Sequence, residues 1–203
     1  YLERWRARLN LFDPERPFMQ VRGLPFAPGE VALLVEHRAR WGGGRDLFEH
    51  RPVDEPGNLS PAQAARSLLV MHAYSAGGLV KKPNEPTSAT AGPLRTGLQA
   101  LLSGSTLFET LLLNLLIYDP ENGRPFFSGF GAAEDKPAWE REALPKELRR
   151  DREPVNSSRG WLELLTWQSR RFELHRDAAG EVTGVVVAVG QGLALPEGVL
   201  DPY

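Results

Sequence analysis

The chain has 203 residues, of which 41% are hydrophobic and 25% charged, and its formal net charge at pH 7 is −2. These values are ordinary for a soluble globular domain and supply enough apolar side chains for a core. The absence of cysteine excludes disulfides and thiolate zinc sites. The lack of a basic excess argues against a broad non-specific nucleic-acid surface, so any such contact has to be local or completed by other subunits. No apolar run is long enough to cross a bilayer, and a cytoplasmic location with no membrane partner is expected.

The first part of the chain predicts short elements separated by turns. Leu2, Trp5 and Leu9 recur at helical spacing and predict a helix over the first nine residues. Residues 17–21 predict a short extended segment, and residues 29–38 predict a short helix.

A stronger helix signal begins at Ser60. The Ser60 hydroxyl can cap free backbone amides, Pro61 suits the first helical position, and Gln63 can complete a capping box. We expect this helix to run to about Tyr74, with four residues near one face: Ala65, Leu68, Leu69 and His72. Residues 75–97 are rich in Gly, Pro, Ser and Thr and are expected to form a long linker, and linkers of this length are usually functional or disordered.

A second helix is predicted to begin at Thr106, which forms a capping-box pattern with Glu109. The leucine-rich stretch that follows, to about Tyr118, is apolar nearly all round, which predicts the central core helix. Residues 119–160 are charged and rich in proline and are expected to be irregular.

The last third of the chain predicts a β-hairpin. Residues 164–175 predict one long strand, residues 177–180 a turn, and residues 182–189 the partner strand. Within the first strand, Trp167 is expected in the core. The expected fold class is therefore α+β: a mixed domain with a few core helices, long irregular loops and a C-terminal β-hairpin.

Sequence motifs for catalysis or metal binding are missing. There is no Gly-x-Ser-x-Gly elbow for a nucleophilic serine and no Gly-x-x-x-x-Gly-Lys run for phosphates. The histidines lack the spacing of a local metal site, so surface or hydrogen-bonded core positions are expected for all four: His37, His50, His72 and His175. Acidic residues are expected to be solvated, for example Glu134, Asp135, Glu140 and Glu142. No catalytic residue, metal or cofactor is expected.

One loop with residue types that suit recognition lies at Phe48, Glu49, His50 and Arg51. An exposed aromatic ring beside a histidine and an arginine can stack on a base or on a partner surface. The alternative is that Phe48 fills the core and the loop has no binding role.

A second such loop lies within residues 75–92. Three glycines, Gly77, Gly78 and Gly92, would let the backbone approach another molecule closely. Lys81 and Lys82 can neutralise phosphates. Because the DNA minor groove is only about 6 Å wide, bare backbone is a suitable probe of it. A plain linker is the alternative interpretation.

Several short motifs occur in an order that resembles a known family. The most prominent is Thr166-Trp167-Gln168-Ser169-Arg170-Arg171. The others are Pro17-Phe18-Met19-Gln20, Leu59-Ser60-Pro61-Ala62-Gln63-Ala64-Ala65-Arg66, Thr106-Leu107-Phe108-Glu109-Thr110-Leu111-Leu112-Leu113-Asn114, Pro137-Ala138-Trp139-Glu140, Val182-Thr183-Gly184-Val185-Val186 and Asp201-Pro202. Together they look like the large subunit of type I-E Cascade, the CasA family of CRISPR proteins.

This resemblance implies a non-catalytic subunit of an RNA-guided surveillance complex. The family combines a mixed α/β N-terminal domain, of which residues 1–203 would be a segment, with a C-terminal four-helix bundle expected outside this chain. It reads the protospacer-adjacent motif in double-stranded DNA, largely from the minor groove, while guide pairing supplies the remaining specificity. The implied partners are double-stranded DNA, the guide RNA 5′ handle, other Cascade subunits and the recruited effector helicase-nuclease.

The resemblance also assigns roles to the two loops. The family loop that lies near the guide RNA 5′ handle and takes part in motif binding falls on Phe48 and the three residues after it. The glycine-containing loop that reads the motif falls between Ser75 and Gly92. Two other functions stay open from the residues alone: a hydrolytic enzyme with an acidic site in residues 119–160, and a purely structural interaction domain.

Overall fold

The computed structural model describes residues 1–34, 57–80, 87–95, 100–115, 134–146 and 155–194. Its centre is an antiparallel hairpin of β4 (Arg170–Arg176) and β5 (Val182–Val189). The amide of Gly180, at φ +89°, donates to the Asp177 carbonyl at 3.1 Å and closes the predicted turn. The hairpin and the expected α+β class are confirmed.

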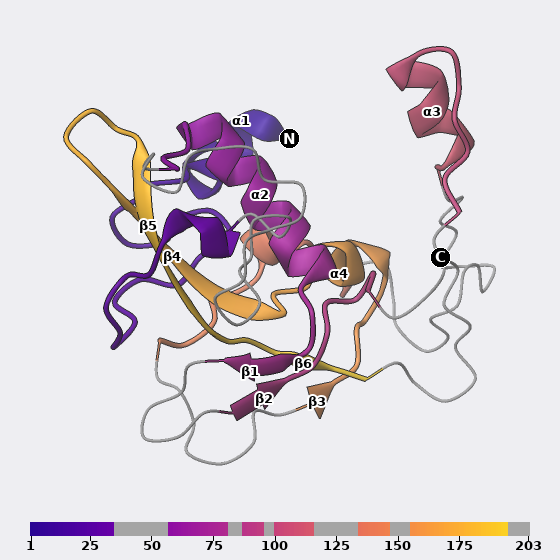
Figure 1. The fold of residues 1–203 in the computed structure, drawn as a ribbon. Coiled ribbons are helices and arrows are strands. Elements are labelled where there is room, and N and C mark those ends of the chain that lie inside the picture. The colour runs from indigo at the N-terminus through magenta and orange to yellow at the C-terminus, as the bar shows by residue number, and fades with distance from the viewer. Residues whose placement is uncertain (35–56, 81–86, 96–99, 116–133, 147–154, 195–203) are drawn as a thin grey trace, which may run out of the picture.

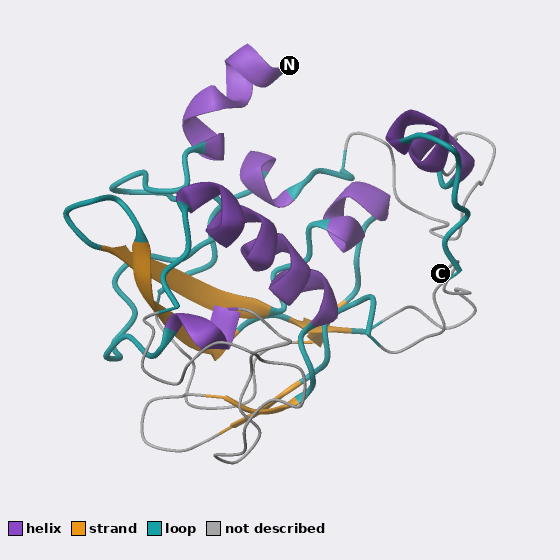
Figure 2. Cartoon of the chain, turned by 45° about the horizontal axis from the view of Figure 1, so that its top comes forward, coloured by secondary structure: helices purple, strands orange, loops and turns teal. Residues whose placement is uncertain are grey.

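Helix α2 (Pro61–Tyr74) lies over one face of this hairpin (Figures 1 and 2). Its predicted start is confirmed, because the Gln63 amide donates to the Ser60 hydroxyl and the Gln63 side chain accepts from the Ser60 amide. The buried face consists of Ala64, Leu68 and His72, one residue every turn. Of the four residues predicted near one face, Leu68 and His72 belong to this buried face, whereas Ala65 is half-buried and Leu69 is 42% exposed.

The core lies between α2, the hairpin and a 3₁₀ turn, η2 (Val31–Leu34). Leu34, Leu68 and Phe172 are fully buried there. The turn η2 is the described part of the helix expected over residues 29–38. The N-terminal helix is confirmed as α1 (Leu2–Trp5), which continues into a 3₁₀ turn, η1 (Arg6–Leu9).

Residues 17–21 form a turn instead of the expected extended segment. Met19 has a φ of +55°, and its side chain is 5% exposed in the core. The Gln20 side chain donates to the Leu11 carbonyl and accepts from the Leu174 amide, each at 2.8 Å. These contacts with residues far along the chain hold the backbone in a conformation that local propensity does not favour.

The expected strand over residues 164–175 was wrong in its first half. Residues Trp161–Leu165 form helix α4, and β4 begins only at Arg170. Helix α4 begins where the Asp135 carboxylate accepts from the amides of Leu162 and Glu163 at 3.1 and 2.9 Å. This capping group lies 27 or more residues away in sequence, so a local pattern does not reveal it.

The expected linker over residues 75–97 contains two short strands, β1 (Gly78–Val80) and β2 (Thr87–Ala89). They pair antiparallel, with Gly78 opposite Ala89, and we call them the β1–β2 ribbon. A second pair, β3 (Val155–Asn156) and β6 (Gly192–Leu193), is parallel. A 3₁₀ turn, η4 (Ala138–Glu140), lies between α3 and β3 in the chain.

Helix α3 (Leu107–Leu113) is not the core helix that its apolar sequence predicts. It begins at the expected cap, where the Glu109 amide donates to the Thr106 hydroxyl at 3.1 Å. Its large side chains are exposed: Leu107 by 74%, Phe108 by 69% and Leu111 by 62%. Figures 1 and 2 both show α3 apart from the hairpin and α2. None of the helices in the described ranges is long and apolar enough to cross a membrane.

Candidate nucleic-acid interface

The structure places some of the predicted binding residues and not others. Phe48, Glu49, His50 and Arg51 lie outside the described residues, as do Lys81 and Lys82. The three predicted glycines, Gly77, Gly78 and Gly92, are described, and all lie at the base of the β1–β2 ribbon next to the C-terminal end of α2.

Gly77 and Gly78 are exposed, and so is Leu79, by 78%. Gly78 has a φ of +138°, which side-chain-bearing residues rarely adopt, and a Cβ built on it would meet no heavy atom within 4 Å. A Cβ on Gly77 would lie 3.3 Å from both the Ala89 carbonyl oxygen and the Ala91 amide nitrogen. The two glycines therefore present bare backbone to solvent on a two-stranded support.

Gly92 is buried and has a packing role. A Cβ on Gly92 would lie 2.5 Å from the Ala73 carbonyl oxygen, so only glycine allows this approach to α2. The Gly92 amide donates to the Ser75 carbonyl at 2.8 Å, and the Leu94 amide donates to the Ala73 carbonyl at 2.9 Å. Among the predicted glycines, only Gly77 and Gly78 are open to a ligand.

Arg170 joins the hairpin to the ribbon, a role that sequence reasoning missed. Its guanidinium donates to the carbonyls of Thr90 at 2.8 Å and Ala76 at 2.5 Å, and its side chain is buried. Burial lowers the pKa of Arg170 to about 10. The neighbouring Ser169 hydroxyl donates to the His72 carbonyl at 2.7 Å. Both residues belong to the motif of residues 166–171 that stood out in the sequence. Their hydrogen-bond partners could not be predicted from it, because those partners lie far away in the sequence.

His72 is a hydrogen-bonded core histidine, as expected. Its Nε2 donates to the Met19 carbonyl at 2.9 Å, and its ring meets Phe172 edge-on with centroids 4.8 Å apart. Desolvation lowers the pKa of His72 to about 4, and the charge of Arg170 contributes in the same direction. No group of three His, Asp or Glu side chains suited to a metal ion occurs in the described part of the chain.

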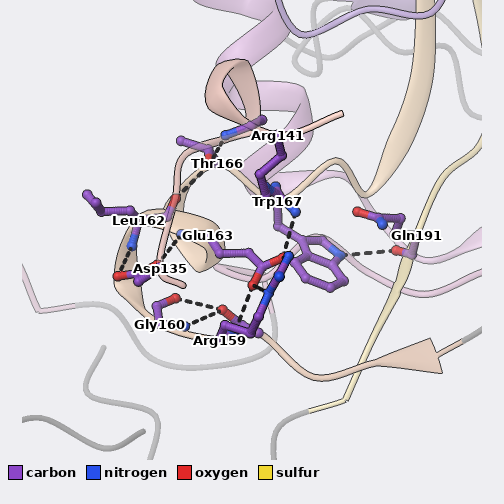
Figure 3. Close-up of polar contacts among 11 residues, drawn as sticks. Asp135, Arg141, Arg159, Gly160, Leu162, Glu163, Thr166, Trp167 and Gln191 are labelled. Atoms are coloured by element: carbon purple, nitrogen blue, oxygen red, sulfur yellow. Dashed lines mark hydrogen bonds and ion pairs between the residues drawn. The ribbon is translucent and has the colours of Figure 1, made fainter. Parts of the chain in front are cut away.

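Buried charges surround the start of α4 (Figure 3). The Glu163 carboxylate accepts from the guanidinium of Arg141 at 2.6 Å and from Arg159 at 3.0 Å. Asp135 is 3% exposed, so the expectation that it is solvated was wrong. Its two oxygens already accept helix amides, and Gly160 packs so closely that a Cβ there would clash with the Asp135 carboxyl group. Each of these two carboxylates therefore has a structural role at the start of α4.

Trp167 follows this helix and is 2% exposed, which confirms its predicted place in the core. Its indole Nε1 donates to the Gln191 carbonyl at 3.1 Å (Figure 3). A cavity nearby, lined by Arg8, Met19, Trp139 and Gln168 among others, has a volume of about 20 Å³. That is room for a single water molecule, whereas small-molecule sites occupy roughly 300–1,000 Å³.

Comparison with known proteins places this geometry in a family. The chain matches the family model for CRISPR-associated protein Cse1 over residues 1–202. It is 35% identical over 184 residues to the CRISPR-associated protein CasA/Cse1 of Thermus thermophilus, an alignment that covers 89% of this chain and 33% of that protein.

Solved structures agree with the sequence match. The crystal structure of Thermobifida fusca Cse1 superposes with a TM-score of 0.72 at 31% identity, covering 96% of this chain and 36% of that one. A chain from a CRISPR RNA-guided surveillance complex in a pre-nicking state gives a TM-score of 0.69 at 27% identity, covering 100% and 39%. The chain thus spans 33–39% of the length of these relatives. On the match over residues 1–202 and the 35% identity to a curated relative, the chain belongs to the CasA/Cse1 family of CRISPR-associated proteins.

Proposed function

We propose that this chain forms part of the N-terminal domain of the large subunit of a type I-E CRISPR surveillance complex, and that the subunit recognises the protospacer-adjacent motif in double-stranded DNA without catalysing a reaction. The observation that carries this proposal is the Cse1 match over residues 1–202, together with the likeness to a chain from an RNA-guided surveillance complex. In such a complex the guide RNA reads most of the target, so the protein has to read only a short motif.

The exposed pair Gly77 and Gly78 supports minor-groove recognition. Backbone without side chains can enter a groove about 6 Å wide, and amide and carbonyl groups can bond to base edges there. The ribbon beneath the glycines supplies a base bonded to α2 and to the hairpin. The formal net charge of −2 agrees with a local contact of this kind and not with a broad phosphate-binding face.

The remaining assignments follow the family resemblance. Phe48, Glu49, His50 and Arg51 would contact the guide RNA 5′ handle and assist motif binding. Lys81 and Lys82 would neutralise DNA phosphates. The complete subunit, with its four-helix bundle, would contact other Cascade subunits and help to recruit the effector helicase-nuclease.

The proposal is tested by gel-shift titrations of the complete subunit in its assembled complex, with duplexes that carry or lack the adjacent motif. Gly78→Val adds a side chain at the exposed glycine, and Phe48→Ala removes the aromatic ring of the other loop. Both variants are expected to lose binding to the motif-bearing duplex selectively. The loss for Gly78→Val should reach about tenfold or more, which corresponds to about 1.4 kcal/mol.

Gly180→Val is the matched control. Gly180 also has a positive φ, +89°, and open space around it, but it lies in the β4–β5 turn at the end of the hairpin away from the ribbon (Figure 1). Similar backbone strain is therefore introduced in both variants. Equal discrimination by Gly78→Val, Phe48→Ala and wild type would refute the two loop assignments. Hydrolytic turnover by the purified subunit would refute the non-catalytic role.

A further inference from the structure

A buried charged side chain lies beneath the base of the β1–β2 ribbon. The Arg170 Nη1 donates to the carbonyl of Thr90, and Nη2 donates to the carbonyl of Ala76. Ala76 directly precedes the Gly77–Gly78 pair, and Thr90 directly follows β2. The two arms of one planar guanidinium therefore hold the incoming and outgoing chains of the ribbon.

The other end of this side chain is held by the hairpin. Arg170 is the first residue of β4 and pairs with Val189 of β5. A Cβ on the adjacent Gly190 would clash with the Arg170 amide nitrogen, so the backbones are packed closely there. Arg170 thus connects the ribbon to a hairpin whose strands are mostly buried.

Stability alone is a poor explanation for a charge at this place. Arg170 is 2% exposed, and no carboxylate forms an ion pair with it within the described ranges. Burying a cation without a carboxylate is costly, and its hydrogen bonds offset only part of that cost. What a guanidinium provides is geometry: a rigid fork makes several charge-assisted hydrogen bonds in fixed directions, which a lysine ammonium cannot reproduce.

We propose that Arg170 is a positioning residue for motif recognition, which fixes the ribbon on the hairpin so that the backbone of Gly77 and Gly78 is presented to the DNA at one angle. This inference rests on the proposed function of the glycine pair. Arg170 does not touch DNA in this role, because its guanidinium is covered and two of its nitrogen atoms are already bonded to carbonyls.

The chain offers a matched control in the next residue. Arg171 is also 2% exposed, but it points to the opposite face of β4 and donates to the carbonyls of Pro145 and Val189. Arg170→Gln and Arg171→Gln each remove one buried guanidinium from the same strand. Thermal unfolding of both variants defines the temperature below which each is folded, and all further measurements are made there.

We call the pair of hydrogen bonds from Arg170 to Ala76 and Thr90 the clamp. Two measurements test separately whether the clamp holds the ribbon and whether it affects motif recognition. The first is hydrogen exchange of the ribbon amides in the complete subunit, without DNA. Arg170→Gln is expected to speed this exchange about tenfold or more, while Arg171→Gln leaves it unchanged. The second is the ratio of affinities for duplexes with and without the motif, measured in the assembled complex. Arg170→Gln is expected to lower this ratio roughly tenfold, and Arg171→Gln is expected to preserve it.

Ribbon exchange that is unchanged in Arg170→Gln would overturn the clamp. Faster exchange with an unchanged affinity ratio would overturn the positioning role. The Gly78→Val result would then show separately whether the glycines read the motif.

Arg170→Lys keeps the positive charge but not the forked guanidinium, and its affinity ratio is expected to lie between those of wild type and Arg170→Gln. Full wild-type behaviour of the lysine variant would show that charge, and not the fork, is what matters, which contradicts the proposal.

Discussion

At the residue scale, the junction of α2, the hairpin and the ribbon depends on polar groups that are buried and bonded to backbone carbonyls. His72 donates to Met19, Ser169 donates to His72, and Arg170 donates to Ala76 and Thr90. The bonds to the Met19 and His72 carbonyls are buried and satisfy main-chain acceptors inside the core, whereas the two bonds from Arg170 are partly buried. The histidine is the member of this set whose ordinary pKa lies closest to neutral pH.

His72 makes folding stability depend on pH. Its pKa falls from 6.5 to about 4 on folding, because burial disfavours the imidazolium form. Between these values the unfolded chain binds a proton that the folded chain does not, so acidification favours unfolding. The stabilising contribution is complete above about pH 6.5 and is lost as the pH falls towards 4. A shift of this size corresponds to about 3 kcal/mol.

Urea unfolding of wild type and His72→Gln over this pH range measures the effect. The glutamine amide can still donate to the Met19 carbonyl, but it does not titrate. The variant is expected to be less stable at pH 7, because it loses the edge-on contact with Phe172, and to lose less free energy of unfolding on acidification. Parallel pH profiles for the two proteins would show that other groups, and not His72, cause the acid sensitivity.

At the scale of elements, helices α2 and α3 show how similar local signals lead to different positions. Both begin with a hydroxyl cap, and both contain leucines, two in α2 and four in α3. Helix α2 places Leu68 in the core at 0% exposure, whereas α3 leaves Leu111 62% exposed. The caps are local hydrogen bonds and were predictable, but the surface that an apolar helix covers depends on segments distant in sequence.

A matched pair of substitutions tests this difference. Leu68→Ala should lower the free energy of unfolding by roughly 2–5 kcal/mol, because it leaves a cavity in the core. Leu111→Ala should change it by no more than about 0.5 kcal/mol, because the side chain is mostly exposed. Both changes occur inside helices, so the difference in helix propensity is the same for each. Equal losses in urea titrations would show that α3 is packed in the folded chain.

At the scale of the whole molecule, net charge limits the kind of DNA contact that the proposed function can use. There are 24 basic and 26 acidic residues, so attraction to phosphates depends on a few local side chains. In the proposed function, Lys81 and Lys82 supply it beside the glycine pair. Such contacts strengthen binding to any sequence and make it sensitive to salt.

Replacement of both Lys81 and Lys82 with alanine should therefore weaken binding equally for duplexes with and without the motif. The slope of log affinity against log salt concentration should fall by up to about 2, since each lysine accounts for close to one released counterion. Fluorescence anisotropy of the assembled complex across a salt series measures both quantities. Lys136→Ala, an exposed lysine next to Asp135 and outside the ribbon, is the control. A selective loss for the motif-bearing duplex would assign these lysines to sequence reading.

The same division between local and distant contacts explains how much of the fold and site was predictable. The capping box at Ser60, the turn at Gly180 and strand β5 depend on residues within a few positions of one another, and all were predicted correctly. The ordered motifs also identified the family.

In contrast, helix α4 depends on Asp135, and the ribbon geometry depends on Arg170. The guanidinium of Arg170 bonds to Thr90 and Ala76, which lie 80 and 94 residues earlier in the chain. A leucine-rich pattern fits both a core helix and the exposed α3, and a glycine-rich stretch fits both a linker and a paired ribbon. Only the folded chain distinguishes these cases, because burial and capping by distant residues are properties of the packed structure.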